Sequence, residues 1–199
     1  ISCTPTNRDY LSKNSSKNLN NYSFIFSYMP TWRKNTWNHE IDFEMMNQFL
    51  ISKDAILYIR PHHLDTSFNI LNSYSNIICP KPSEKPIHDS HHDLLGTDAL
   101  ISDYSSLIHD FLLSKRPILA YTPDFFEYKE KANFCVDYDS VIPTAKIMKF
   151  DELIKNMNLI IENKYCYKKY DQLLDLYHSY KDKDSSLRLY KEVKTICMN

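Results

Sequence analysis

Short apolar runs that alternate with helix-like segments are the feature that most constrains the fold of this chain. Strands are predicted where apolar, β-branched and aromatic residues run together, at 22–28, 55–59, 76–79, 99–102 and 117–121. Between these runs, helices are predicted at 41–50, 67–74, 91–95 and 105–114. Strands that alternate with helices in this way form a parallel sheet with helices on both faces, which is a Rossmann-like α/β fold.

The two ends of the chain differ from this alternating middle part. Residues 1–21 are polar and rich in Asn, Ser and Lys, so we predict a linker, or the end of a preceding domain. Residues 22–199 are predicted to form one Rossmann-like domain, and helical apolar stripes from residue 151 onward predict a helical C-terminal tail. Because parallel strands share one carboxyl edge, the loops after Tyr28, Ile59, Ile101 and Tyr121 are expected on one rim, where such sheets bind ligands.

Composition excludes several classes of protein. The 199 residues carry 24 Lys and Arg against 25 Asp and Glu, so no global basic field favours nucleic acid or an anionic membrane. Five scattered cysteines without a C-x-x-C pair disfavour a disulfide framework and a zinc ribbon, and they fit a reducing cytoplasm. The sequence also lacks the apolar run of a membrane span and the layout of a signal peptide.

A serine-rich turn follows the predicted strand 99–102. Ser102 and Asp103 are followed by Tyr104, Ser105 and Ser106 and then by a predicted helix. Backbone N–H groups at the start of a helix lack partners within the helix and lie at the positive end of its dipole, so this turn suits a phosphate. An ordinary serine-capped helix that turns its apolar side toward the core is the alternative reading.

Two further loops carry polar residues directly after predicted strands. Arg33 offers a planar fork suited to phosphate and Thr31 offers a hydroxyl, although an Arg beside Trp32 also packs on an indole ring in many proteins. His62 is able to carry a proton near neutral pH, although it and His63 also fit ordinary exposed loop residues.

A fourth polar segment, 88–93, holds three histidines and two aspartates. Adjacent residues on one turn rarely converge on a metal ion, so we expect no metal site there.

These segments together resemble the CDP-glycerol glycerophosphotransferases, bacterial enzymes that build teichoic-acid and capsule polymers. The resemblance covers roughly residues 5–160. It is carried by the sequence from Ser102 to Ser106 with Asp110, by Pro30-Thr-Trp-Arg33 (the family's "APTWR"), by His62 after a strand, by Asp93-Leu-Leu, and by Lys115-Arg-Pro-Ile with Tyr121, Asp124 and Tyr128.

The resemblance implies the C-terminal, donor-binding half of a GT-B fold. It implies transfer of glycerol phosphate from CDP-glycerol to a polymer acceptor hydroxyl, with release of CMP and without a metal or other cofactor. The residues that it places in the donor site are Thr31, Arg33, Ser102, Asp103, Ser105, Ser106 and Asp110, with Ser105 and Ser106 on the phosphates. His62 and Asp93 are the implied catalytic residues.

The implied partners are CDP-glycerol, a polymer or lipid-linked acceptor and a preceding acceptor domain, with peripheral association at the inner face of the cell membrane and no nucleic acid. A chain that begins at the linker is expected to be weakly active or inactive alone. Two alternatives stay open: a different GT-B nucleotide-sugar transferase, or a non-catalytic Rossmann-like module.

Overall fold

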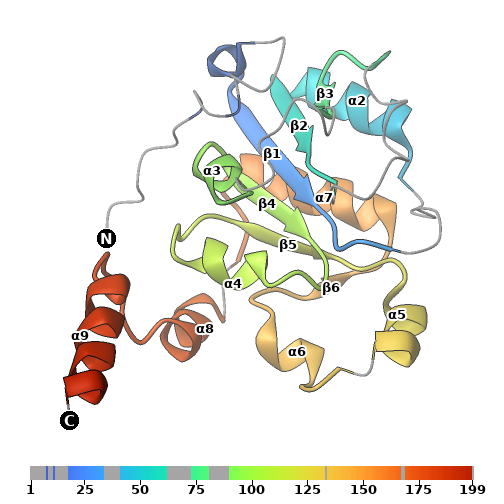
Figure 1. Cartoon of the computed structure of the whole chain (residues 1–199). Coiled ribbons are helices and arrows are strands. Elements are labelled where there is room, and N and C mark those ends of the chain that lie inside the picture. The colour runs from blue at the N-terminus through green and yellow to red at the C-terminus, as the bar shows by residue number, and fades with distance from the viewer. Residues whose placement is uncertain are drawn as a thin grey trace.

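A parallel six-stranded sheet forms the centre of the molecule, in the order β3-β2-β1-β4-β5-β6 (Figure 1). The computed structural model describes residues 8, 11, 18–33, 41–61, 73–80, 90–132, 134–166 and 169–198. The strands are β1 Phe24–Met29, β2 Ala55–Ile59, β3 Ile77–Ile78, β4 Ala99–Ser102, β5 Ile118–Tyr121 and β6 Lys146–Ile147. The predicted α/β fold with a parallel sheet is therefore confirmed.

The strands coincide with the apolar runs of the sequence. This is because both faces of the sheet are covered, so that side chains on both sides of a strand are buried. All five residues of β2 are buried, as the continuous run of apolar residues predicts for a central parallel strand. Side chains alternate along β1, so that Ile25 packs on one face of the sheet and Phe26 on the other.

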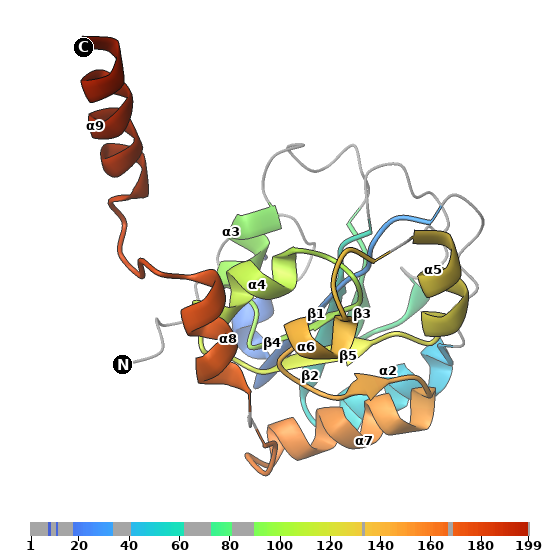
Figure 2. The same ribbon diagram turned by 90° about the horizontal axis from the view of Figure 1, so that it is seen from below.

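Helices α2 (Phe43–Ser52) and α7 (Phe150–Ile161) cover one face of the sheet (Figure 2). The carboxylate of Asp42 accepts a hydrogen bond from the amide of Met45, which caps the start of α2. The buried side chains of both helices form one core with Phe26, Tyr28, Leu57, Ile59, Ile101, Leu119 and Tyr121; they are Met46, Leu50, Leu153, Met157 and Ile160.

Helices α3 (Ser90–Leu95), α4 (Leu107–Leu112) and α8 (Tyr170–Tyr177) lie on the opposite face. Figure 2 shows α3 and α4 on the side of the sheet away from α2 and α7. They enclose a second apolar cluster, which comprises Met29, Leu94, Leu100, Ile108, Phe111, Leu112, Ile118, Tyr170, Leu173 and Leu174. The predicted helix 67–74 lies mainly outside the described residues.

Two residues of the predicted linker 1–21 belong to the core of this domain. Leu11, and Leu19 in the 3-10 helix η1 (Leu19–Asn21), are fully buried and pack with Ile25 of β1 and Tyr58 of β2. Whether the domain boundary falls at residue 21 stays a prediction.

We expect Leu11→Ala to lower the free energy of unfolding by at least about 2 kcal/mol, the low end of the range for a buried Leu, because its fully buried side chain packs with Ile25 and Tyr58. Urea denaturation of the full chain measures this loss. Leu189→Ala is the matched control, since Leu189 is 66% exposed and its removal should change stability by less than about 0.5 kcal/mol. Equal stability of the two variants would show that Leu11 contributes nothing to the fold.

Some elements were not expected from the sequence. Helices α5 (Phe125–Ala132) and α6 (Tyr138–Val141) and the short strand β6 lie between β5 and α7.

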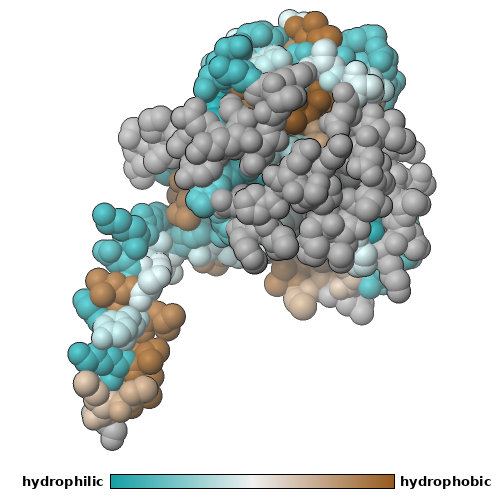
Figure 3. Space-filling model, turned by 45° about the horizontal axis from the view of Figure 1, so that its top comes forward, coloured by the Kyte–Doolittle hydropathy of each residue, from teal (hydrophilic) through white to brown (hydrophobic). Residues whose placement is uncertain are grey.

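Helix α9 (Ser185–Met198), in the predicted helical C-terminal tail, extends away from the body of the molecule (Figure 2), and none of its residues is buried. Figure 3 shows hydrophobic side chains along one side of α9. In the described part of the chain, no helix has the length and apolar character needed to cross a membrane.

The strand order reverses direction between β1 and β4, which pair directly with each other. In open parallel sheets, ligands bind beyond the carboxyl ends of the strands at such a switch point. The loop after β1 carries Thr31 and Arg33, and the turn after β4 carries the serines. The fold therefore brings the predicted donor-site loops to the position where Rossmann-like sheets bind their ligands.

Candidate donor site at the switch point

The serine turn is anchored where β4 ends. Ser102 is fully buried, and its Oγ donates a hydrogen bond of 2.7 Å to the carbonyl of Met29, the last residue of β1. This bond fixes the two strand ends against each other at the switch point. Ser102 thus has a protein partner, and its predicted contact with a donor stays a prediction.

Asp103 is the centre of a hydrogen-bond network between the loops after β1 and β4. Its Oδ1 accepts bonds from the Thr31 amide (2.8 Å), the Thr31 hydroxyl (2.6 Å) and the Tyr104 amide (2.6 Å). Its Oδ2 accepts a bond of 2.8 Å from Nη2 of Arg33. The Asp103 side chain is only 1% exposed, so these bonds satisfy a carboxylate that burial would otherwise destabilise.

Arg33 connects the same network to the loop after β5. Its Nε donates to Oδ2 of Asp124 at 2.8 Å, and its Nη1 donates to the Thr31 carbonyl at 2.6 Å. Its guanidinium carbon lies 5.1 Å from the ring centre of Tyr104 and 4.6 Å from that of Tyr128. The rings of Tyr104 and Tyr128 therefore both lie close to the Arg33 guanidinium.

Burial and charge act in opposite directions on Arg33. Burial alone would lower the pKa of Arg33, but the hydrogen bond to Asp124 and the charges of Asp103 and Asp124 outweigh it and raise the pKa. Burial, together with the charge of Asp124, also raises the pKa of Tyr104. At neutral pH Arg33 therefore stays charged and the Tyr104 hydroxyl stays neutral.

Ser105 and Ser106 form the part of the turn that faces outward. The Oγ of Ser105 accepts a 3.3 Å bond from the Leu107 amide, while Ser106 is exposed and makes no capping bond with its side chain. Among the described residues, no acceptor pairs with the amides of Ser105 and Ser106. The predicted arrangement, in which serine amides at the start of α4 lack internal partners, is present.

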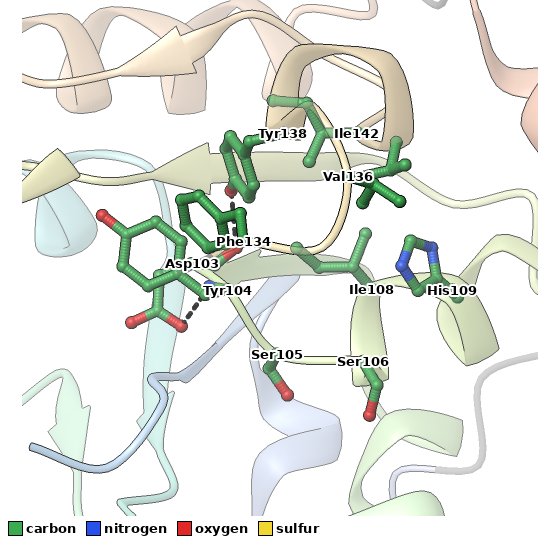
Figure 4. A pocket seen from close by; sticks show the side chains of 11 residues that line it. Asp103, Tyr104, Ser105, Ser106, Ile108, His109, Phe134, Val136, Tyr138 and Ile142 are labelled. Atoms are coloured by element: carbon green, nitrogen blue, oxygen red, sulfur yellow. Dashed lines mark hydrogen bonds between the residues drawn. The ribbon is translucent and has the colours of Figure 1, made fainter. Parts of the chain in front are cut away.

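A cavity of about 190 Å³ lies beside this turn. It is lined by Phe134, Tyr138 and Ile142 and by residues of α4 and the turn. Figure 4 shows the Ser105 and Ser106 hydroxyls pointing away from these aromatic side chains. The Tyr138 hydroxyl donates a 2.6 Å bond to the Asp103 carbonyl, which is a second anchor for the start of the turn.

Asp93 lies in α3, and its side chain is 1% exposed. It forms an ion pair with Arg60, which directly follows β2, and Oδ2 of Asp93 lies 3.4 Å from the Tyr58 hydroxyl. Burial, followed by the charge of Asp93, raises the pKa of Tyr58. The carboxylate of Asp93 is thus enclosed by protein, and its catalytic role stays a prediction.

Two predicted site residues remain, Asp110 and His62. Asp110 is exposed on α4, and its Oδ2 lies 3.2 Å from Nε2 of His91. His62 lies outside the described residues. Within the described ranges, His, Cys, Asp and Glu side chains form no group able to hold a metal ion.

The structure therefore unites part of the predicted donor site. Thr31, Arg33 and Asp103 lie in one network beside the serine turn, as the shared rim predicts. Sequence reasoning had assigned no site role to Asp124 or Tyr128, which complete that network. The spacing of Tyr121, Asp124 and Tyr128 had been recognised as part of the family resemblance, and this was the available signal.

The parallel sheet, its switch point and the serine turn define a Rossmann-like domain of the type found in GT-B transferases. The sequence profile of the family "CDP-Glycerol:Poly(glycerophosphate) glycerophosphotransferase" matches residues 4–195. The chain belongs to this family, whose members carry out phosphotransfer in teichoic acid synthesis.

Curated relatives of the chain are named as teichoic acid polymerases and primases. The chain is 27% identical over 176 residues to the teichoic acid ribitol-phosphate polymerase TarK of Staphylococcus aureus, covering 85% of this chain and 33% of the relative. It is 30% identical over 163 residues to a teichoic acid poly(glycerol phosphate) polymerase of Bacillus spizizenii, covering 77% of this chain and 39% of the relative. The chain thus spans little more than a third of these relatives.

The solved structure of the wall teichoic acid polymerase TagF has the same fold. It superposes with a TM-score of 0.70 at 23% identity, over 96% of this chain and 49% of that protein. The GT-B type of fold that the resemblance implies is thereby confirmed.

Proposed function

We propose that this chain is the donor-binding part of a CDP-glycerol-dependent glycerophosphotransferase. The single observation that carries the proposal is the serine turn at the switch point, whose amides lack internal acceptors among the described residues, in a chain of this family. In support, soaking experiments on the TagF variant H444N used CDPG, although that structure is only 24% identical to this chain.

The proposed reaction is the attack of an acceptor hydroxyl on the phosphorus that carries glycerol. A new P–O bond forms to the acceptor, the P–O bond of the diphosphate bridge breaks, and CMP leaves with the bridging oxygen. Amides that point at the phosphoryl oxygens stabilise negative charge that grows there. The amides of Ser105 and Ser106 take this role, and Asp110 contacts the donor beside them.

The proton of the acceptor hydroxyl needs a base, and His62 is the proposed residue because imidazole is able to accept a proton near neutral pH. The acceptor is a polymer or lipid-linked chain at the inner face of the membrane, held mainly by a preceding domain. No metal or other cofactor and no nucleic acid is part of the proposal.

Ribitol phosphate is the second candidate for the transferred group. The relative TarK is a ribitol-phosphate polymerase, and the similarity to it extends over 85% of this chain. Both groups are attached to their nucleotide through a phosphate, so the serine turn suits either donor. Discrimination between glycerol and ribitol must therefore depend on other residues of the site.

We expect CDP-glycerol to raise the melting temperature of the chain, because a ligand that binds only the folded state stabilises it by mass action. At about 100 times the Kd, the stabilisation is about 2.7 kcal/mol. Scanning fluorimetry with CDP-glycerol, CDP-ribitol and a UDP-sugar in parallel measures the preference. A larger shift with the UDP-sugar would select a different nucleotide-sugar transferase. No shift with any nucleotide, also when the preceding domain is included, would favour a non-catalytic module.

A further inference from the structure

The guanidinium of Arg33 is already used by the protein. Its Nε, Nη1 and Nη2 all donate to acceptors within the chain, and Nη2 lies 2.8 Å from Asp103 and 3.4 Å from Asp124. The Arg33 side chain is 13% exposed. Since these bonds use four of the five N–H groups of an arginine, little donor capacity is left for a ligand.

The charge of this network does not favour an anion either. One guanidinium faces two carboxylates, so Arg33, Asp103 and Asp124 together carry one excess negative charge. A phosphate that replaced one of these carboxylates would take the Arg33 cation away from a partly or fully buried carboxylate, which is costly. Coordination and charge thus both point away from direct contact between Arg33 and a phosphate.

The network instead fixes the start of the serine turn. Through Asp103, Arg33 supports the bond that holds the Tyr104 amide, and the Tyr104 hydroxyl donates a 3.0 Å bond to Asp124. The Tyr104 ring stacks on Tyr128 with ring centres 3.8 Å apart. Tyr104 is held at its amide, its ring and its hydroxyl, and the next two residues are Ser105 and Ser106.

We propose that Arg33 is a positioning residue that fixes the serine turn through Asp103 and Asp124 and does not itself contact the donor. This differs from the expectation, drawn from the planar fork of Arg33, that its guanidinium binds a phosphate directly. The proposal rests on the proposed function for what the turn binds, but the network itself is independent of any ligand. Asp124 acts with Arg33 as a second positioning residue.

Hydrogen exchange on the ligand-free chain tests the network directly. We expect Arg33→Lys to speed exchange at the amides of Thr31 and Tyr104 by about tenfold or more, because Lys cannot bridge two carboxylates with a planar fork. Arg188→Lys is the matched control, because Arg188 also pairs with a carboxylate (Asp182) and lies 3.9 Å from a tyrosine ring (Tyr180), but it belongs to the exposed helix α9. Unchanged exchange at Thr31 and Tyr104 in Arg33→Lys would overturn the proposal.

The affinity for CDP-glycerol distinguishes a positioning role of Arg33 from a direct contact between Arg33 and the donor. Under our proposal, Arg33→Lys and Asp124→Asn each weaken CDP-glycerol binding by a similar factor, and the double variant binds no more weakly than either single variant. If Arg33 contacted the phosphate, Lys would largely replace it as a point charge, and Asp124→Asn would strengthen binding by removing a competing negative charge. Titration calorimetry that gave this second pattern would overturn the proposal.

The two measurements also separate failure of this inference from failure of the proposed function. Absence of CDP-glycerol binding by the unaltered protein contradicts the proposed function. The exchange measurement needs no donor, so it still decides whether Arg33 fixes the turn. Melting temperatures of all variants identify any that fail to fold, and Asp124→Asn then replaces Arg33→Lys in the exchange experiment with the same expected result at Tyr104.

Discussion

Arg60→Ala is expected to lower the free energy of unfolding by about 3–5 kcal/mol, the range for removing one partner of a buried ion pair. Asp93 is 1% exposed, and Arg60 pairs with it from the end of β2. Without Arg60, a buried carboxylate loses its cation while the Tyr58 hydroxyl, 3.4 Å away, compensates only in part. Urea denaturation at pH 7 measures the loss.

An exposed ion pair provides the control for Arg60→Ala. Lys131 and Glu127 pair on α5 with side chains that are 68% and 67% exposed, so Lys131→Ala should cost less than about 0.5 kcal/mol. Adding Asp93→Asn to Arg60→Ala should recover part of the lost stability, because the buried negative charge is then gone. A loss below about 1 kcal/mol in Arg60→Ala would mean that Asp93 is satisfied without Arg60.

This result also bears on the predicted catalytic role of Asp93. Because its carboxylate is enclosed, a loss of activity in Asp93 variants has a structural explanation as well as a catalytic one. Arg60→Ala leaves the carboxylate in place. If its activity falls only in proportion to the unfolded fraction, the ion pair stabilises the fold and has no separate part in transfer.

The central strands of the sheet could be predicted from the sequence because they are buried on both faces. Strands buried on both faces are apolar along their whole length, and β2 and β4 have the predicted bounds 55–59 and 99–102. Strand β6 was not predictable, because it has only two residues and one of them, Lys146, is half-buried and charged. Such a strand leaves no apolar run in the sequence.

The site was predictable to the level of loops but not of side-chain partners. Parallel strands place the loops after β1 and β4 on one edge, which correctly predicted that Arg33 and Asp103 lie together. The structure places Tyr104 and Tyr128 beside Arg33, and the sequence analysis had not predicted either ring there. Those tyrosines lie some 70 to 95 positions away, and only the meeting of loops from β1, β4 and β5 brings them to Arg33.

Ser106→Pro is expected to weaken CDP-glycerol binding by about 10- to 150-fold, the equivalent of losing one hydrogen bond to a charged group, about 1.5–3 kcal/mol. The φ angle of Ser106 is −61°, which proline adopts without strain, and within the described residues its amide has no acceptor to lose. We therefore expect the substitution to remove one N–H from the turn and to leave the fold intact. Melting temperature and titration calorimetry measure the two effects separately.

Ser106→Ala is the matched control for Ser106→Pro, because it removes the hydroxyl and keeps the amide. The Ser106 side chain makes no capping bond, so this variant should melt like the unaltered protein. If backbone amides hold the phosphates, donor affinity stays within a few-fold in Ser106→Ala and falls only in Ser106→Pro. If both variants bind equally weakly, the hydroxyl is the ligand, and if both bind normally, the phosphates are held elsewhere and the turn is only the start of α4.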